Sequence, residues 1–340
     1  MANAKKRGDN YRVLVYVGTE NGKRKYKSFT AATKKQAEYM ADAYRLRQKR
    51  ELANITVADA VGRYIELKRP VLSPSTLREY VRLRDNAFDL IGKTLADNMT
   101  SARVQHWVSE YARTHSPKST QNAKGLLLSA LRMFCPDKSF SVTMPQAERK
   151  RRAVPTDADV AALLRFFRGG PMEAAIYLAA FGTMRRGEIC ALTWDDVSGD
   201  VVHVARALVR DENGQTVSKA PKTTRGDRFI TMPPGVIDRI REICPESPIV
   251  GMPLNEVTKQ FGRAVRRLNL PPIRFHDLRH YSAAVMHFLG VPEHYAMNRG
   301  GWENKQTMTQ IYEDIMTDKT DAITETINGY FGKVFTEVQP

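Results

Sequence analysis

The sequence predicts a multidomain, mainly helical protein. Residues 1–50 are expected to form a small β-sheet plus a helix, and residues 55–140 an all-α module. Residues 156–340 are expected to form a mixed, mainly α domain with a small antiparallel sheet. The prediction rests on apolar residues at helical spacing along most of the chain, and on β-prone runs confined to residues 11–30 and 201–232. A length of 340 residues suits two or three domains.

Charge is distributed unevenly along the chain, which carries a formal net charge of +16. Residues 1–50 hold 14 lysines and arginines against 4 aspartates and glutamates, and residues 51–155 hold 17 against 10. Residues 156–340 are nearly balanced, with 22 against 23. Such a basic surface is expected to bind nucleic acid or an acidic membrane face. The excess in the first half favours an enzyme that handles DNA.

Nothing in the sequence indicates secretion or membrane insertion. No apolar run approaches the roughly 18 residues that span a bilayer, and the basic N-terminus is not followed by the apolar stretch of a signal peptide. Cys135, Cys190 and Cys244 are widely spaced and cannot all pair. They fit packing roles in a reducing cytoplasm, which is the expected location.

Residues 11–30 indicate a basic hairpin. Asn21-Gly22 stands between two β-prone runs, and Thr33 is a suitable N-cap for a helix that begins at Lys34. Basic residues alternate with tyrosine here, which suits contact with DNA phosphates or with a groove, although a solvated hairpin is the alternative. The candidate DNA contacts are Arg12, Lys23, Arg24 and Lys25.

Residues 55–134 predict four helices. Thr56 opens a segment with apolar residues at helical spacing, and Pro74 and Ser75 are start signals of a second helix. Two further helices include residues 100–108 and 118–131. One side of this module is expected to face DNA phosphates, although any single basic residue is more often plain surface. The candidates are Arg78, Arg82, Arg84, Lys118 and Lys124.

Residues 141–155 are predicted to form a basic linker. A run of four basic residues from Arg149 stops shortly before Pro155, as exposed connections do. A solvated tether and a tether that contacts DNA fit this composition equally well. The candidate contacts are Lys150, Arg151 and Arg152.

The last domain is expected to begin at Thr156, a good N-cap. A buried helix should end at Gly182. Arg185 and Arg186 follow directly before another apolar segment, where purely superficial arginines are not expected. Glu188 is expected to hold one of these two arginines in place by an ion pair.

The β-prone runs of this domain lie at residues 201–204, 216–219 and 229–232. The last two runs flank a turn that is expected to hold Lys222 over the site. Helices are expected at residues 236–243, 254–268 and 304–315, followed by an amphipathic tail at 322–331.

The cluster at residues 274–280 supplies the clearest chemical signal. His276 and Arg279 are three residues apart, so on a helix they share a face. His276 also falls near the first turn of a predicted helix, where free backbone N–H groups and the helix dipole favour an anion. The cluster therefore suits the binding of a phosphate.

The candidate residues together suit phosphoryl transfer. Arg185 and Arg279 are each able to donate two parallel hydrogen bonds to a phosphate. Tyr312 offers a phenol as nucleophile, His276 a general base, and Lys222 an acid for the departing 5′ oxygen. Each residue alone is commonplace, so the order and joint presence carry the prediction. The sequence has no carboxylate cluster, zinc spacing or P-loop, so neither a metal nor another cofactor is expected.

The order Arg185, Lys222, His276-x-x-Arg279, Trp302 and Tyr312 resembles the tyrosine recombinase family of phage and mobile-element integrases. Residues 184–194 resemble the first arginine box of that family, and Pro221-Lys222-Thr its β-hairpin lysine segment. Residues 276–280 match the second box in full. Gly301-Trp302 and the later Thr-Gln-Ile-Tyr312 resemble the final box. The match covers residues 156–320, while residues 55–134 look like a core-binding domain and residues 1–50 like an arm-site-binding domain.

The resemblance implies a fold shared with type IB topoisomerases and a reaction without metal or ATP. Tyr312 would attack a DNA phosphate, giving a 3′-phosphotyrosyl link and a free 5′ hydroxyl that then attacks the partner duplex. Strands would be exchanged through a Holliday junction in a homotetramer on core-type and arm-type sites of double-stranded DNA. The resemblance also implies a bacterial host cell, a possible excision directionality factor, and a C-terminal stretch, 320–333, that packs on a neighbouring subunit.

Two departures from the family pattern stand out. Trp302 occupies a position that usually holds histidine, although its indole N–H is still able to donate to a phosphate. Gly187 stands where serine or alanine is common, which is a milder change. His280 is expected to support the site from beside it.

Two other functions fit the same fold. A non-catalytic DNA-binding regulator would not need Tyr312. A type IB topoisomerase-like relaxing enzyme would share the chemistry but would not need a second DNA-binding module at residues 1–50.

Overall fold

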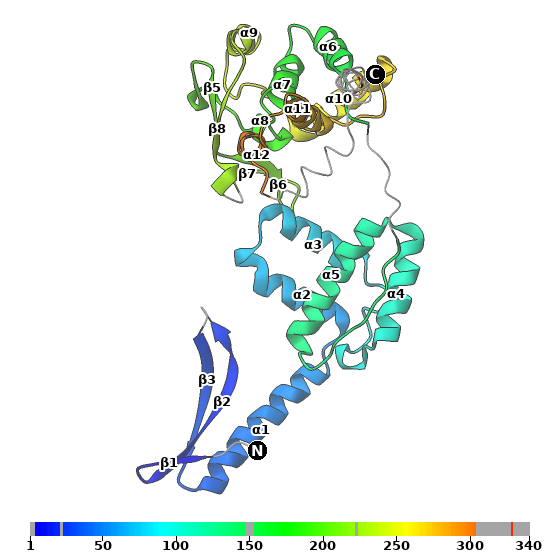
Figure 1. The fold of residues 1–340 in the computed structure, drawn as a ribbon. Coiled ribbons are helices and arrows are strands. Elements are labelled where there is room, and N and C mark those ends of the chain that lie inside the picture. The colour runs from blue at the N-terminus through cyan, green and yellow to red at the C-terminus, as the bar shows by residue number, and fades with distance from the viewer. Residues whose placement is uncertain (1–3, 21–22, 147–152, 222–223, 304–327, 329–340) are drawn as a thin grey trace, which may run out of the picture. The chain divides into compact units, whose positions relative to one another are not determined.

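The computed structural model divides the chain into two compact units, Met1–Glu148 and Arg149–Pro340 (Figure 1). No helix in the described part of the chain is long and apolar enough to cross a membrane. The structure describes residues 4–20, 23–146, 153–221, 224–303 and 328.

The first unit begins with a three-stranded antiparallel sheet, in the order β1-β2-β3, and one helix, α1, packed on it (Figure 1). Val13 and Val15 on β2 are buried against the helix, because alternate residues of a strand point to the same face. Thr33 caps the helix as predicted. The predicted turn residues, Asn21 and Gly22, lie outside the described residues. The elements span Lys5–Arg7 (β1), Asn10–Glu20 (β2), Lys23–Ala31 (β3) and Lys34–Ala53 (α1).

Four helices with a common core follow in the same unit, as predicted for this stretch. Thr56, Ser73, Thr100 and Ser116 each accept a hydrogen bond from the backbone N–H three residues later, which satisfies a donor at each helix start. Trp107 is the largest buried side chain of this core. The helices span Val57–Lys68 (α2), Pro74–Asn86 (α3), Ser101–Thr114 (α4) and Pro117–Phe134 (α5).

The chain beyond α5 runs back along α4. The Gln105 side chain accepts a hydrogen bond from the Thr143 N–H at 2.8 Å and donates to the Thr143 carbonyl at 3.2 Å. Side chains at 140, 142 and 144 pack against the helical core. The stretch predicted as a linker is thus attached to the helices through residues 141–146.

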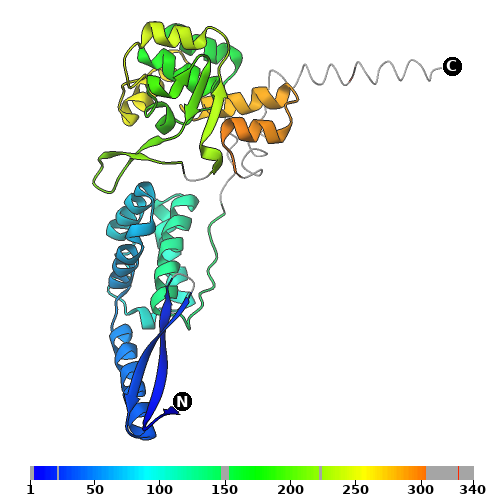
Figure 2. The same ribbon diagram turned by 90° about the vertical axis from the view of Figure 1, so that its left-hand side faces the viewer.

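The described part of the second unit is mainly helical and contains two small antiparallel sheets, β4-β5-β8 and β6-β7. The β6-β7 hairpin projects from the body of the unit (Figure 2). Strand β6 was not predicted, and β7 and β8 lie in different sheets, so these two strands do not pair with each other. The strands span Val197–Ser198 (β4), Val201–Val204 (β5), Ala207–Arg210 (β6), Thr216–Lys219 (β7) and Arg228–Thr231 (β8).

Helix α7 lies at the centre of this unit. Its alanines, such as Ala175 and Ala179, are buried and allow α11 to approach closely. Thr156 caps α6 as predicted, in a capping box with Asp159. The residues predicted as helix 304–315 and as the tail lie outside the described part, except Asn328. The helices span Asp157–Phe166 (α6), Pro171–Ala180 (α7), Arg186–Ile189 (α8), Val236–Ile243 (α9), Leu254–Arg267 (α10), Asp277–Phe288 (α11) and Glu293–Gly300 (α12).

Candidate active site

Four segments that are distant in sequence meet in the second unit: the loop before α8, the start of β8, the start of α11 and the end of α12. Hydrogen bonds join the first segment to the last, since Arg185 Nη2 donates to the Gly301 carbonyl at 2.9 Å. The start of β8 joins the same place, since Arg228 Nε donates to the Arg299 carbonyl at 3.0 Å. The start of α11 joins through Arg279, which donates to the Thr183 carbonyl.

Arg185 stands at the N-cap of α8 and is held by Glu188. Its Nη1 donates to Glu188 Oε1 at 2.7 Å, and its backbone N–H donates to Oε2 at 2.8 Å. The ion pair predicted for Glu188 is therefore present. The Arg185 side chain remains 41% exposed, whereas that of Glu188 is 7% exposed. The guanidinium can thus reach a ligand while its carboxylate partner stays inside.

Arg228 is the second partner of Glu188, and it was not predicted. Its Nη2 donates to Glu188 Oε2 at 2.9 Å, and both side chains are almost fully buried. Burial would raise the pKa of the Glu188 carboxyl, but hydrogen bonds and charge attraction from Arg228 and Arg185 outweigh it and hold that pKa below its usual value. Glu188 is therefore a buried carboxylate between two cations.

Arg279 lies on α11 and is 1% exposed. Its guanidinium lies over the Trp302 ring, 4.0 Å from the centroid, in a cation–π contact. Among the described residues its buried Nη2 has no hydrogen-bond partner. Burial, and then the nearby Arg185 and Arg228 cations, lower the pKa of Arg279, against the opposing effect of Glu188. A cation in this position is expected to gain strongly from an anion.

His276 is the N-cap residue of α11, next to both arginines. Desolvation, followed by Arg279, Arg185 and Arg274, lowers the pKa of its imidazole to about 4, although Asp277 opposes the shift. His276 is a solvent-exposed residue, so water weakens the desolvation effect. The surrounding cations act in the same direction, and at neutral pH the ring is uncharged and able to accept a proton.

Trp302 is 5% exposed and packs with Ala283, Met286 and Ala296. Its backbone carbonyl accepts a hydrogen bond from Arg225 Nη1 at 3.2 Å. Gly301, directly before it, has a φ of 62°, and a Cβ there would lie 2.8 Å from the Arg225 carbonyl oxygen. This glycine is required because the arginines approach the backbone so closely.

The assembled site has a chemistry suited to an anion such as a phosphodiester. Arg185 and Arg279 are cationic donors, and the neutral His276 is a proton acceptor. Within the described residues, no three histidine, cysteine or carboxylate side chains cluster as metal ligands would.

Comparison with known proteins identifies related families and folds. The sequence model described as the Phage integrase family matches residues 156–318. A "Tyrosine recombinase XerC-like" protein of Caldanaerobacter subterraneus subsp. tengcongensis is 23% identical, over 94% of this chain and 96% of its own. The integrase of Mycobacterium phage L5 is 26% identical, over 92% and 93%. Residues 156–318 thus carry a Phage integrase family domain, and the relatives support a tyrosine site-specific recombinase.

Solved structures share the recombinase fold. The Tn1549 transposon integrase in complex with transposon right end DNA aligns over 80% of this chain and 99% of its own, with a TM-score of 0.68 and 20% identity. A lambda integrase tetramer bound to a Holliday junction aligns over 92% and 95%, with a TM-score of 0.60 and 16% identity. At these identities the similarity establishes the fold alone.

The structure of this recombinase brings together Arg185, His276, Arg279 and Trp302 of the predicted catalytic set. Lys222 and Tyr312 lie outside the described residues. The structure places Trp302 under Arg279 in a small apolar cluster, and its role as a phosphate donor stays a prediction.

His280 lies beside the site, as predicted. Its ring meets that of His276 edge to face, with centroids 4.9 Å apart, and its Nε2 lies 3.8 Å from Asp277 Oδ1. A supporting role for His280 stays a prediction.

Two further residues of the site were missed by sequence reasoning. Thr183 is fully buried with a φ of 52°, and its carbonyl accepts the hydrogen bond from Arg279. Arg228 follows a surface-like basic stretch and carries no local signal of burial. Gly187 was taken as a mild departure, yet a Cβ there would lie 2.6 Å from the Leu208 carbonyl oxygen on the unpredicted β6. The close approach of that strand favours glycine.

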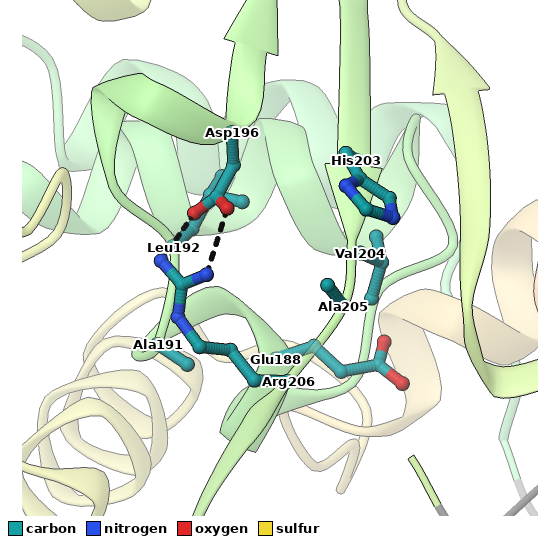
Figure 3. A pocket seen from close by; sticks show the side chains of 8 residues that line it. All are labelled: Glu188, Ala191, Leu192, Asp196, His203, Val204, Ala205 and Arg206. Atoms are coloured by element: carbon teal, nitrogen blue, oxygen red, sulfur yellow. Dashed lines mark hydrogen bonds and ion pairs between the residues drawn. The ribbon is translucent and has the colours of Figure 1, made fainter. Parts of the chain in front are cut away.

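A second arginine–carboxylate pair lies nearby but apart from the site. Arg206 donates to both oxygens of Asp196, at 2.8 and 2.6 Å, and to Thr193 Oγ1 at 2.8 Å. Both Glu188 and this pair line a small pocket, but the Glu188 carboxylate lies away from Arg206 (Figure 3). The Arg206–Asp196 pair can therefore serve as a control for the Arg228–Glu188 pair at the site.

The predicted DNA contacts of the first unit lie on solvent-exposed or partly exposed surface wherever their side chains are described. Arg12 donates to Ser28 Oγ at 2.6 Å on the sheet. Arg82 is paired with Glu79 at 2.8 Å, and Arg84 with Asp85 at 2.7 Å. Their contact with DNA stays a prediction, as does that of Arg24, Lys25, Arg78, Lys118 and Lys124. The side chains of Lys23, Lys150, Arg151 and Arg152 lie outside the described residues.

Proposed function

We propose that this integrase cuts and rejoins DNA through a 3′-phosphotyrosyl link at Tyr312, and thereby integrates and excises a phage or mobile element. The observation that supports this most is the convergence of Arg185, Arg279 and a neutral His276 in one place, with a buried Arg279 donor that has no partner among the described residues. Cationic donors and a proton acceptor at one point are what attack on a phosphodiester requires.

The steps balance without an outside energy source. The Tyr312 oxygen forms a bond to phosphorus, and its proton passes to His276. The bond from phosphorus to the 5′ oxygen breaks, and Lys222 gives that oxygen a proton. Arg185 and Arg279 stabilise the charge on the non-bridging oxygens, while Trp302 supports Arg279 and offers its indole N–H. Attack of a 5′ hydroxyl on the phosphotyrosyl link reverses these steps and reseals the strand.

The partner is double-stranded DNA with core-type and arm-type attachment sites, on which four copies exchange strands. Solved integrases with this fold are described bound to DNA, and one as a tetramer on a Holliday junction. The basic residues of the first unit are proposed to hold the DNA, the 1–50 module the arm-type sites and the 55–140 module the core-type sites. We place the reaction in the cytoplasm of a bacterial host, with an excision directionality factor as a further partner.

Covalent trapping tests the proposal. Wild-type protein and Tyr312→Phe are mixed, in EDTA, with nicked duplexes taken from the DNA that flanks the gene, and denaturing gels report protein–DNA adducts. An adduct that needs Tyr312 is expected. Clear DNA binding without an adduct on any fragment would favour a non-catalytic regulator. An adduct with relaxation of any supercoiled plasmid, unaffected by deletion of residues 1–50, would favour a type IB topoisomerase-like enzyme.

A further inference from the structure

We infer that Arg228 is a positioning residue for the reaction: through Glu188 it fixes the guanidinium of Arg185, and through a backbone contact it fixes the Arg299–Trp302 segment. The inference rests on the proposed function, because Arg185 is taken to bind the phosphate that is cut.

The contacts of Arg228 leave its guanidinium almost fully occupied. Nη2 donates to Glu188 Oε2 at 2.9 Å, and Nη1 donates to Oε1 at 3.3 Å. Nε donates to the Arg299 carbonyl at 3.0 Å, and Nη1 also reaches the Gly226 carbonyl at 3.3 Å. The side chain is 5% exposed. Arg228 is therefore not available to a DNA phosphate and acts through the groups that it holds.

Glu188 transmits the position of Arg228 to Arg185. Each carboxylate oxygen accepts one hydrogen bond from Arg228 and one from Arg185, the latter at 2.7 Å for Oε1 and 2.8 Å for Oε2. A carboxylate with four donors has a single favourable orientation. That orientation sets the plane of the Arg185 guanidinium and leaves its Nη2 directed at the Gly301 carbonyl.

Charge balance gives Arg228 a second effect. With Arg228 present, the negative charge of Glu188 is shared between two guanidiniums, and Arg185 keeps positive charge for a phosphate. Without Arg228, the buried carboxylate would hold Arg185 more tightly or would take up a proton and release it. Either outcome removes a well-placed cation from the scissile phosphate.

The same residue also holds the other side of the site. The Arg299 carbonyl that accepts from Arg228 Nε also accepts from Thr183 Oγ1 at 3.1 Å. The Thr183 carbonyl in turn accepts a hydrogen bond from Arg279. Arg228 thus connects the two phosphate-binding arginines through described contacts, which explains why an arginine is buried at the start of β8.

The test compares Arg228→Met and Arg228→Lys with Arg206→Met in the full-length chain. Arg206 forms a pair with Asp196 in the same unit but outside the site, with 36% of the Arg206 side chain exposed (Figure 3). The rate of adduct formation is measured in a single turnover at saturating nicked duplex, and the Kd for DNA and thermal unfolding are measured separately. Saturation separates positioning from binding.

We expect Arg228→Met to lower the single-turnover rate by about 10²-fold, the effect of losing one well-placed donor, while the Kd changes less than about threefold. Arg228→Lys keeps the charge without the fork and should recover part of the rate. Arg206→Met should keep the wild-type rate within about threefold, since it leaves the site unchanged.

A double mutant tests the route through Glu188. In Glu188→Gln the orientation of Arg185 should already be lost. Adding Arg228→Lys to this variant should then lower the rate by much less than Arg228→Lys lowers it in the wild type. The inference is overturned if folded Arg228→Lys reacts at the rate of Arg206→Met, or if the two losses are independent and multiply. Failure of the wild type to form any adduct would instead reject the proposed function itself.

Discussion

Two buried arginines of the second unit differ in how their charge is satisfied. Arg228 makes four hydrogen bonds, two of them to the Glu188 carboxylate. Arg279 is as deeply buried, yet it donates to one carbonyl and rests on the Trp302 ring, and its Nη2 has no partner among the described residues. The two buried guanidiniums are thus stabilised differently, the first by a carboxylate and the second by one carbonyl and an aromatic ring.

Removal of Arg279 should have the largest effect on the reaction. We expect Arg279→Met to lower the single-turnover rate of adduct formation by about 10³-fold, because a cationic donor to the phosphate is lost. The thermal midpoint should be retained or raised, because a buried charge with few partners is costly. A large drop in the midpoint, measured by thermal unfolding without DNA, would contradict this contrast with Arg228.

Removal of Arg228 should instead have the largest effect on stability. Arg228→Met leaves the Glu188 carboxylate buried with one charged partner, and we expect the free energy of unfolding to fall by about 3–5 kcal/mol. Urea unfolding of the full-length chain measures it. Arg206→Met is the control, and a loss of about 1–2 kcal/mol is expected because Asp196 keeps its hydrogen bonds to Thr193. Equal losses in the two variants would show that the Arg228–Glu188 pair contributes no more to stability than the Arg206–Asp196 pair.

The pH dependence of the adduct rate should report the protonation of His276. Its pKa is lowered to about 4, so the neutral base is present above that pH and is lost as pH falls through it. At subsaturating DNA, the acid limb of the adduct rate should therefore lie well below pH 6.5, the ordinary value for histidine. His276→Gln should lower the plateau by about 10²-fold and remove this limb. His294→Gln, outside the site, should leave the profile unchanged, and an acid limb near pH 6.5 in the wild type would contradict the assignment.

A substitution at Gly301 should disturb the contacts of Arg228 less than removal of Arg228 itself does. A Cβ there would lie 3.2 Å from Arg228 Nη1 as well as close to the Arg225 carbonyl. We expect Gly301→Ala to cost about 1–3 kcal/mol and to lower the rate about tenfold. Gly290→Ala is a matched control, because Gly290 also has a positive φ but open space around it. Equal rates in the two variants would mean that only backbone strain matters.

Much of the local structure followed from the sequence. Caps at Thr33 and Thr156 were identified correctly, because a cap is a contact between residues three apart. Strand pairing was predicted less well. Strand β6 was missed, and β7 and β8 lie in different sheets. Strand pairing depends on which segments meet in space, and a short β-prone run carries little information about its partner.

The order Arg185, His276-x-x-Arg279, Trp302 and Tyr312 was enough to determine the family and the class of chemistry, because side chains that perform a reaction must be of particular types. Only the tertiary structure decided how Arg185 and Arg279 are held. The sequence gives Arg228 no sign of burial, and its partner Glu188 lies 40 residues away along the chain. A charge is stabilised by whatever lies within a few ångströms of it, and for a buried charge those neighbours are set by the fold rather than by sequence distance.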